Sequence, residues 1–363
     1  MTWERLERKA ALRAKAGLTR RTAPRDGDAI DLAGNDYLGL SRHPQVITAA
    51  AKALTRYGLG ATGSRLVRGT TAEHEKLESE LAEWTGFGSA LVYSSGYLAN
   101  LGILKALSSK RTRLLADAHA HASLIDGCRA SGATVEVIEH NSVPSTLDAD
   151  CIVVVESIYS VDGDLAPLAE LHAACRSAGA LLLVDDAHGL GVIGQQGSGG
   201  AADAGIAGEP DVIVTATLSK ALGAAGGVVL GPAALRAHLV DTGRTFIYDT
   251  APPPAVVAGA RAALHLARGF ELARGVLHER AAKAAVALGV PEPAGGVLSV
   301  PAPSPQAAVD WAADCRIQGV AVGCFRPPST PDGTARLRLT INAGVPNHDF
   351  DRALEVVSEC APS

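Results

Sequence analysis

Short apolar runs recur through the first two thirds of the chain, and stretches with helical spacing separate them. The runs lie at 90–93, 112–116, 134–138, 151–155, 180–184, 211–216 and 227–230. Several lack an alternating polar face, which is typical of strands that helices cover on both sides. The stretch at 167–178 has Pro167 in its first turn and Gly179 just past its end, as helices often do. The pattern therefore predicts an α/β domain with a mostly parallel central sheet.

Both ends of the chain have a different pattern. Residues 1–20 predict an amphipathic helix, a second helix begins after Pro44, and a third follows Thr70, where Thr70 and Glu73 match a capping box. Farther on, an Ala-rich helix at 255–288 precedes a strand, a helix, two strands and a final helix. We expect three parts, which are an N-terminal helical segment at 1–40, a large α/β domain at 41–246 and a small α+β domain at 247–363.

Composition narrows the class of protein. The 363 residues carry a formal net charge of −5 with no long run of one sign, so nothing indicates a nucleic-acid partner. The longest apolar stretch, 212–231, contains Lys220 and several glycines, which argues against a membrane helix. The first twenty residues lack the apolar core of a signal peptide, so we expect a cytoplasmic protein. The six cysteines lack metal-ligand spacing, and we expect neither a disulfide framework nor a metal site.

Polar side chains follow five of the predicted strands. In open α/β sheets, ligands bind beyond the carboxyl ends of the strands, so these side chains are expected to meet at one edge of the sheet. In chain order they are Ser94, Ser95, Gly96 and Tyr97; Asp117, His119 and His121; Glu156 and Ser160; Asp185, Asp186 and His188; and Thr217, Ser219 and Lys220. Such a collection is hard to explain as packing and predicts a functional site.

Lys220 is the most specific candidate in this collection. Of the eight lysines, it alone lies between an apolar run and a Gly/Ala-rich segment. A desolvated lysine has a lowered pKa and can attack a carbonyl to form a Schiff base. Asp185 ends an apolar strand 35 residues earlier, where a carboxylate is placed to hold a cofactor ring nitrogen protonated. From these residues alone, a phosphate-binding or structural lysine and a solvated turn aspartate remain open.

Two glycine-containing segments are candidates for phosphate binding. Ser95-Gly96-Tyr97 opens a helix, whose first backbone N–H groups and dipole favour an anion. The segment 189–194 matches GxGxxG after a strand, as a dinucleotide site requires. However, no helix follows it at once, and no acid-tipped strand follows about 20 residues later. We expect the second segment to be a loop beside the site.

Seven motifs together resemble the α-oxoamine synthases, which are fold-type I pyridoxal 5'-phosphate enzymes. They are NDYLGLSRHP (35–44), SSGYLANLG (94–102), HASL (121–124), SIYSVDGDLAPL (157–168), VDDAHG (184–189), TLSKALG (217–223) and RPPSTPDGTARLRLT (326–340). The resemblance covers residues 3–355 in family order. It implies an α/β fold-type I transferase, with a mostly parallel central sheet between two layers of helices and a smaller α+β C-terminal domain.

The resemblance implies roles around the cofactor. Lys220 should hold it as a Schiff base and then act as acid and base, Asp185 should pair with the ring nitrogen, His188 should bond the phenolic oxygen, and His121 should stack on the ring. The other implied cofactor contacts are Gly96, Tyr97, Ser160, Thr217 and Ser219, with Thr250 reaching the partner subunit.

The resemblance also implies a substrate side. Arg338 should bind the amino acid carboxylate with Asn35 and His121 nearby, and Arg20 should meet the acyl substrate, with Arg21 as an alternative alignment. Ser329 is a further substrate contact at a position that is usually threonine, and it keeps the hydroxyl. Three residues that lie close to these in the sequence are expected to have other roles. His119 is a loop histidine, Arg336 points away from Arg338 because alternate strand residues face opposite sides, and Asp186 is structural. Asp249 stands where an uncharged residue is expected.

The implied reaction is the condensation of an amino acid with an acyl thioester, with loss of carbon dioxide. Within the family, the chain most resembles the acyltransferase of biotin biosynthesis that joins L-alanine to a pimeloyl thioester carried by coenzyme A or acyl carrier protein. The alternatives are the member that joins glycine to acetyl-CoA, an aminotransferase, and a non-catalytic module. The resemblance further implies a homodimer with its active site at the subunit interface.

Overall fold

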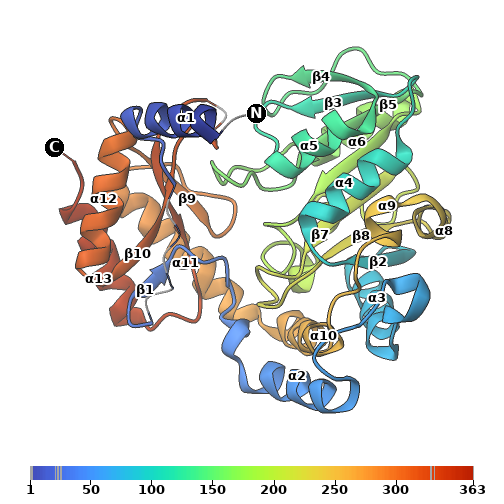
Figure 1. The fold of residues 1–363 in the computed structure, drawn as a ribbon, viewed down its shortest axis with the longest axis horizontal. Helices are drawn as coiled ribbons and strands as arrows, with labels where there is room; N and C mark the ends of the chain where they lie inside the picture. Colours follow the sequence, from blue (N-terminus) through green and yellow to red (C-terminus); the bar gives the residue numbers. More distant parts are fainter. Residues whose placement is uncertain are drawn as a thin grey trace.

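A seven-stranded sheet forms the centre of the larger half of the molecule (Figure 1). The computed structural model describes residues 3–20, 22, 24, 27–327, 329–330 and 332–362. The sheet has the order β2-β8-β7-β6-β5-β3-β4, and only β8 runs antiparallel to its neighbours. Its strands are β2 (Ser89–Tyr93), β3 (Arg113–Asp117), β4 (Thr134–Ile138), β5 (Cys151–Glu156), β6 (Leu181–Asp185), β7 (Val212–Thr217) and β8 (Gly227–Gly231). All seven predicted strands are confirmed, each to within one residue at either end.

The sheet is apolar on both faces because helices cover both. Ile152 and Val154 of β5 belong to one core cluster, while Val153 and Val155 belong to the other, so successive side chains enter opposite layers. The main covering helices are α3 (Ala72–Thr85), α4 (Gly96–Leu107), α5 (Ala122–Ser131), α6 (Leu168–Ala178) and α8 (Ala233–Thr242). Short segments complete the layer, namely α7 (Gly200–Asp203) and α9 (Arg244–Ile247). The fold is therefore the predicted α/β architecture.

The smaller half contains a four-stranded sheet with the order β1-β10-β11-β9. Its strands are β1 (Ile30–Leu32), β9 (Val297–Pro301), β10 (Val320–Phe325) and β11 (Arg336–Thr340). Its helices are α11 (Glu271–Leu288), α12 (Pro305–Ile317) and α13 (Asn347–Glu359). Strand β1 pairs in parallel with β10, which joins the N-terminal segment to the C-terminal sheet. The N-terminal segment of the proposed three-part division therefore contributes a strand to the sheet of the C-terminal part.

The first helices of the chain differ in how they are placed. Helix α1 (Trp3–Lys15) contributes no buried residue. Helix α2 (Pro44–Tyr57) begins at Pro44 itself and packs along α10 (Pro254–Gly269), as Figure 1 shows. Among the residues that the structure describes, no helix combines the length and apolar character needed to cross a bilayer.

Two local predictions were wrong. The capping box of α3 uses Thr71 and His74, because the Thr70 hydroxyl is already bonded to Arg65, donating to its carbonyl at 2.7 Å and accepting from its Nε at 3.0 Å. The predicted helix at 255–288 is two helices, α10 and α11, that break at Phe270 (φ −87°, ψ 45°). The Ala267 carbonyl at the end of α10 accepts both the Phe270 N–H at 3.2 Å and the buried Arg274 side chain at 2.5 Å.

A buried ion pair ties α3 to the first strand of the large sheet. Arg65 Nη1 lies 2.8 Å from Glu78 Oε1, and both side chains are almost wholly buried. The same carboxylate oxygen accepts the Val92 N–H at 2.9 Å, and Arg65 donates to the Val92 carbonyl at 3.1 Å. Arg236 adds a second cation, 3.2 Å from Glu78 Oε2. Glu78 therefore holds two arginines and a strand in one place.

Replacing Glu78 by alanine is expected to lower the free energy of unfolding by about 3–5 kcal/mol, because the Arg65 charge stays buried without its partner. Urea unfolding followed by circular dichroism measures the change. The matched control is Glu75→Ala, which removes an exposed carboxylate from the same helix and should change stability by less than about 0.5 kcal/mol. Equal midpoints for the two variants would contradict this assignment.

Candidate active site

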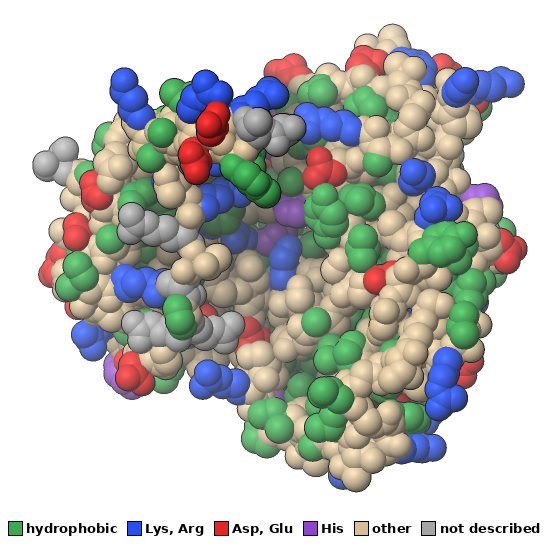
Figure 2. Space-filling model, viewed as in Figure 1, with side chains coloured by type: hydrophobic (Ala, Val, Ile, Leu, Met, Phe, Trp, Pro, Cys, Tyr) green, Lys and Arg blue, Asp and Glu red, His purple; other side chains and the backbone are tan. Residues whose placement is uncertain are grey.

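A cavity of about 550 Å³ opens between the two halves of the molecule. Figure 2 shows this face, with histidine and basic side chains inside the hollow. Eight side chains predicted for the site line it: Arg20, Asn35, His121, Ser160, His188, Lys220, Ser329 and Arg338. They come from the N-terminal segment, the large sheet and the small sheet, which the fold brings to one place. His119 and Phe325 also line the cavity.

Lys220 lies in the turn that follows β7, and its amine faces His188. Lys220 Nζ is 2.7 Å from His188 Nε2. Burial lowers the pKa of Lys220 to about 8, with the Asp185 carboxylate opposing this shift and Arg338 adding to it. Burial, with the charges of Lys220 and Arg338, also lowers the pKa of His188 well below its usual value. The site therefore contains an amine that is poised to lose its proton next to a neutral imidazole.

Asp185 is held by a residue that the sequence analysis missed, Asn100 of α4. Asn100 Nδ2 donates to Asp185 Oδ2 at 2.7 Å, and the Ala187 N–H donates to Asp185 Oδ1 at 3.0 Å. Asn100 Oδ1 in turn accepts from the Thr215 hydroxyl at 2.6 Å. These bonds fix the carboxylate at the end of β6. The motif containing Asn100 was recognised, but nothing in its spacing indicated a contact with a residue 85 positions later.

The same network reaches His121. Asn100 Nδ2 also donates to Ser123 Oγ at 2.8 Å, and Ser123 Oγ lies 2.7 Å from His121 Nδ1. His121 caps the start of α5 by accepting the Ser123 N–H at 3.2 Å. Burial lowers the pKa of His121, partly opposed by the Asp185 charge. One chain of hydrogen bonds thus orients both the predicted ring acid and the predicted stacking histidine.

The first turn of α4 forms a cradle with the loop after β7. Ser95 caps the helix by accepting the Leu98 N–H at 3.2 Å. The N–H groups of Gly96 and Tyr97 belong to the first turn and lack helical partners by position. A Cβ on Gly96 would lie 3.3 Å from Thr217 Cβ, and Thr217 Oγ1 is 2.7 Å from Ser219 Oγ. The cradle offers two backbone donors and two hydroxyls, a donor set that suits a phosphate.

Arg338 reaches the cavity from the small sheet. Its side chain is buried, donates from Nη2 to Asn35 Oδ1 at 3.1 Å, and lies 5.1 Å from the centre of the Phe325 ring. Arg336, two residues earlier, pairs instead with Asp162 and Asp332. Residues 336 and 338 are two apart on β11 and therefore share a face of the strand, so the prediction that they point opposite ways by alternation was wrong. The two arginines differ instead in their partners.

Arg20 and Ser329 meet at the outer part of the cavity. Arg20 Nη2 donates to Ser329 Oγ at 2.8 Å, although the two residues are 309 positions apart. Arg326 holds the N-terminal segment nearby by donating to the carbonyls of Gly17 and Thr19. Arg21, the alternative to Arg20, lies outside the described residues.

Some predicted residues lie outside the lining of the cavity. Gly96, Tyr97, Thr217 and Asp185 are not among the residues that line it, and the Tyr97 hydroxyl donates to Asp126 at 2.8 Å. Thr250 is exposed and forms an isolated bridge with Ser64. Its role toward a partner subunit stays a prediction.

The residues beside the motifs have structural contacts. The unexpected Asp249 carboxylate accepts from the Ser94 hydroxyl, which accounts for a charged residue at that position. Asp186 accepts from Ser157 and from the Gly200 N–H, so it holds the loop that contains the 189–194 glycine segment. Only a short turn and no long helix follows that segment, as expected.

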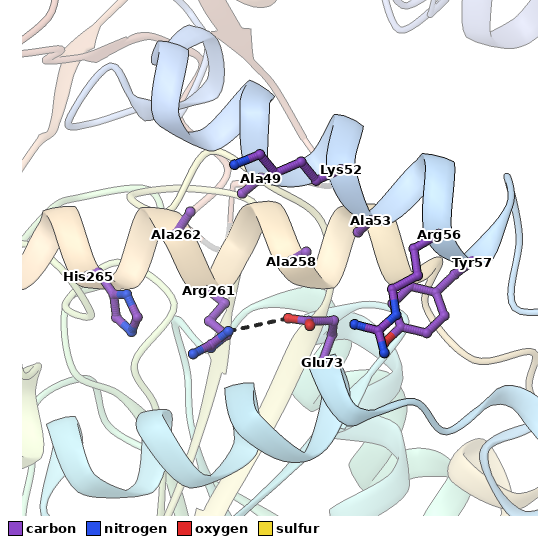
Figure 3. A pocket seen from close by; sticks show the side chains of 10 residues that line it. All are labelled: Ala49, Lys52, Ala53, Arg56, Tyr57, Glu73, Ala258, Arg261, Ala262 and His265. Atoms are coloured by element: carbon purple, nitrogen blue, oxygen red, sulfur yellow. Dashed lines mark hydrogen bonds and ion pairs between the residues drawn. The ribbon is translucent and has the colours of Figure 1, made fainter.

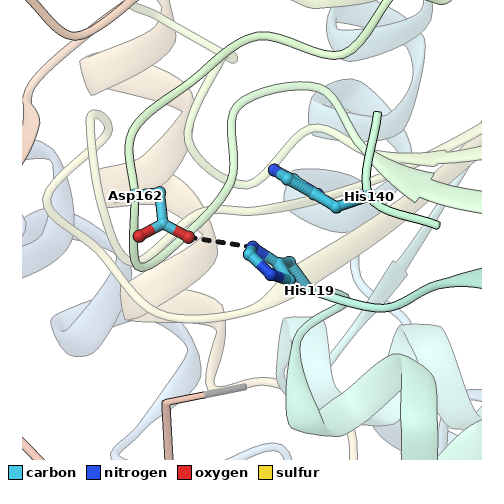
Figure 4. A group of neighbouring side chains, drawn as sticks. All are labelled: His119, His140 and Asp162. Carbon is cyan, nitrogen blue, oxygen red and sulfur yellow. Dashed lines mark hydrogen bonds and ion pairs between the residues drawn. The ribbon is translucent and has the colours of Figure 1, made fainter. Parts of the chain in front are cut away.

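A pair of stacked histidines adjoins the cavity (Figure 4). The His119 and His140 rings lie 3.8 Å apart at 15°, and His119 Nδ1 is 2.9 Å from Asp162. His140 has a carboxylate 2.9 Å from each ring nitrogen, from Asp117 and Asp164. Although burial opposes it, these two carboxylates raise the pKa of His140 above its usual value. The cluster is an ion-pair network that joins three loops at the edge of the sheet.

A separate groove of about 280 Å³ lies between α2 and α10 (Figure 3). It is lined by cations, but Arg261 is already paired with Glu73 and Glu80. None of the residues predicted for the site lies in it. The chemistry therefore belongs to the larger cavity.

Comparison with known proteins agrees with this geometry. The family model described as "Aminotransferase class I and II" matches residues 27–357. The chain belongs to this family. An 8-amino-7-oxononanoate synthase of Mycolicibacterium gilvum (strain PYR-GCK) is 50% identical over 357 residues, which cover 96% of this chain and 94% of that protein.

Solved structures of the family superpose closely. The Sphingomonas wittichii serine palmitoyltransferase matches with a TM-score of 0.90 and 30% identity, covering 99% of this chain and 96% of that chain. A serine palmitoyltransferase variant from S. paucimobilis, solved with a bound PLP–myriocin aldimine, matches with a TM-score of 0.89 and 28% identity, covering 99% and 97%. Together with the curated relative, these neighbours place the chain in the α-oxoamine synthase branch of the family, as its motifs predicted.

Lys220 is expected to titrate near pH 8, well below an ordinary lysine near 10.5, because burial disfavours its charged form. The neutral amine should then make up roughly a tenth of the population at pH 7. A pH titration of protein labelled with ¹³C-lysine, without cofactor, measures the midpoint, and Lys220→Arg assigns the signal. The control is Lys283→Arg, a substitution at an exposed lysine paired with Asp351, which should leave the signal assigned to Lys220 and its midpoint in place. A Lys220 midpoint at the ordinary value would refute the prediction.

Proposed function

We propose that this protein uses pyridoxal 5'-phosphate to condense L-alanine with a pimeloyl thioester. The products are 8-amino-7-oxononanoate, carbon dioxide and the free thiol, in a step of biotin biosynthesis. The observation that carries the proposal is that Lys220, an amine with a lowered pKa, and Arg338, a buried guanidinium, line the same cavity. The identity of 50% to a named 8-amino-7-oxononanoate synthase over nearly the whole chain supports the choice of substrates.

The residues present fit pyridoxal 5'-phosphate. Lys220 supplies an amine for its aldehyde, and the fixed Asp185 carboxylate is suited to its ring nitrogen. The cradle of Gly96, Tyr97, Thr217 and Ser219 is suited to its phosphate. His121 lines the cavity and belongs to the hydrogen-bond network that holds Asp185. Each part of the cofactor thus has a complementary group in the chain.

Arg338 would bind and orient alanine. A guanidinium presents donors in the fork that a carboxylate accepts, and Arg338 Nε has no partner among the described residues. Asn35 holds the other end of the guanidinium in place. Fixing the alanine carboxylate there leaves its Cα free to face the amine of Lys220.

Lys220 would move the proton in the reaction. When bound, the cofactor supplies a cationic ring that takes up the electron pair left at Cα. The neutral Lys220 amine removes the Cα proton, and Cα then attacks the thioester carbonyl, so that a C–C bond forms as the thiol leaves. The original carboxylate departs as carbon dioxide, and Lys220 returns a proton to Cα. Its low pKa matches this acid–base task near neutral pH.

Arg20 and Ser329 would meet the acyl substrate at the outer cavity, where a guanidinium and a hydroxyl are suited to an anionic group. We further propose a cytoplasmic homodimer in which Thr250 approaches the phosphate of the partner subunit. Coenzyme A and acyl carrier protein are both included as carriers in the experiment.

The deciding experiment incubates the purified holoenzyme with L-alanine and pimeloyl-CoA, with L-alanine and pimeloyl–acyl carrier protein, and with glycine and acetyl-CoA. Mass spectrometry of the aminoketone and release of carbon dioxide from labelled amino acid measure turnover. Alanine with a pimeloyl thioester should give the highest kcat/KM. A preference for glycine and acetyl-CoA would assign the protein to the other branch of the family.

Replacing Lys220 by alanine is expected to lower kcat by at least about 10²–10⁴-fold, because the group that moves the Cα proton is removed. The same assay measures the loss. Lys283→Ala, which removes an exposed lysine far from the cavity residues, should retain wild-type kcat. If Lys220→Ala retained near-normal turnover, the assignment of the acid–base group would be wrong.

A further inference from the structure

Tyr37 lies beneath the cavity and was recognised only as part of a motif. It follows β1 in the N-terminal segment and is wholly buried. Its backbone is fixed at both ends, because Tyr37 N donates to Asn35 O and Ala343 N donates to Tyr37 O, each at 2.9 Å. A Cβ on Gly296 would come within 2.6 Å of the Tyr37 ring, so a glycine is needed there to admit it. The ring therefore has a single well-defined position.

The Tyr37 hydroxyl begins a chain of three polar groups that ends at Lys220. It lies 2.5 Å from His188 Nδ1, and His188 Nε2 lies 2.7 Å from Lys220 Nζ. The Tyr37 and His188 rings meet edge to face at 61°. All three groups are buried or line the cavity, so each hydrogen bond is made away from bulk water.

The direction of these hydrogen bonds follows from which groups are neutral. Burial raises the pKa of Tyr37 to about 12, although Arg338 opposes the shift, so the phenol keeps its proton. His188 is a neutral imidazole for the reasons given above, and a neutral imidazole has one N–H and one acceptor nitrogen. Arg338 has only N–H donors and cannot accept a hydrogen bond from the phenol. The Tyr37 hydroxyl therefore donates its proton to His188 Nδ1. The imidazole proton must then be on Nε2, facing Lys220.

We propose that Tyr37 is a positioning residue that lowers the proton affinity of Lys220 by holding His188 in the tautomer whose Nε2–H donates to Nζ. An ammonium at Lys220 can only donate hydrogen bonds. In this tautomer His188 Nε2–H is also a donor, so the two groups would repel each other. Protonating Lys220 therefore requires His188 to move its own proton to Nδ1, where the Tyr37 hydroxyl already donates. The phenol thus acts on the lysine through the imidazole, without touching it.

The other charged and titratable groups around Lys220 are present whether or not this hydroxyl is. Asp185 and Glu156 favour its charged form, while Arg338 and burial disfavour it. His121 and His188 are the imidazoles nearby, and the charge of Lys220 lowers the pKa of each. Removing only the Tyr37 oxygen leaves all of these in place, so the contribution of the relay is separable.

The test uses Tyr37→Phe protein without cofactor, labelled with ¹³C-lysine and ¹⁵N-histidine. Above the Lys220 midpoint, the wild-type His188 ¹⁵N shifts should show a protonated Nε2 and a bare Nδ1. In Tyr37→Phe, the Lys220 midpoint should rise by about one pH unit, a tenfold gain in proton affinity. Between the two midpoints, His188 should therefore carry its proton on Nδ1 in the variant and on Nε2 in the wild type. An unmoved midpoint, or the same His188 tautomer in both proteins at a pH between the midpoints, overturns the proposal.

Tyr93→Phe is the matched control. Tyr93 is also buried, and its hydroxyl is among the buried polar atoms without a partner in the described residues, so its loss should leave the Lys220 midpoint and the His188 shifts unchanged. If Tyr37→Phe does not fold, as judged by circular dichroism, His188→Gln is the second test. A glutamine amide can turn its oxygen toward an ammonium, so this variant should also raise the Lys220 midpoint, and a midpoint at the wild-type value overturns the relay.

The holoenzyme provides an independent readout, which rests on the proposed function. The acidic limb of the kcat pH profile should move up by the same unit in Tyr37→Phe and stay in place in Tyr93→Phe. If the protein turned over neither pair of substrates, the proposed function would fail while the titration of the free protein still decided the role of Tyr37.

Discussion

A buried amine that contacts no carboxylate among the described residues is the constraint around which this molecule is organised. Water stabilises an ammonium strongly, so a lysine placed at the end of β7 inside the cavity is pushed toward its neutral form. The groups around Lys220 then decide how far its pKa is lowered. Asp185 is held by Asn100 and the Ala187 N–H instead of pairing directly with the lysine, and the contact to Nζ is an imidazole. The carboxylate is therefore available to a cofactor ring, and the amine is available to a carbonyl.

The edge of the sheet could be predicted because each part of the pattern is local. Apolar runs covered on both faces give strands, and the polar residues that follow them must meet at the carboxyl edge. This logic placed Lys220, His188 and His121 at one cavity without any knowledge of contacts. The different roles of the β11 arginines did not follow from alternation, because residues two apart share a face of a strand and only their partners separate them.

What the sequence could not give was contacts between distant positions. Tyr37 touches His188 across 151 positions, and Asn100 touches Asp185 across 85. Spacing carries no information about such pairs, because they depend on how β1 joins the small sheet and how α4 packs on β7 and β8. The two local errors arose at shorter range. The Thr70 hydroxyl is hydrogen-bonded to Arg65, five residues away, and Arg274 donates to the Ala267 carbonyl at the helix break, so arginine side chains overrode the local signals.

The pairing of β1 with β10 has a consequence for how the chain is made. Residues 30–32 are synthesised almost three hundred residues before their partner at Val320–Val322. The large sheet can assemble during translation, whereas Asn35 and Tyr37 can dock only when the C-terminal strands exist. The catalytic pocket is therefore completed last, and a truncated nascent chain would have the lysine without the groups that govern its proton.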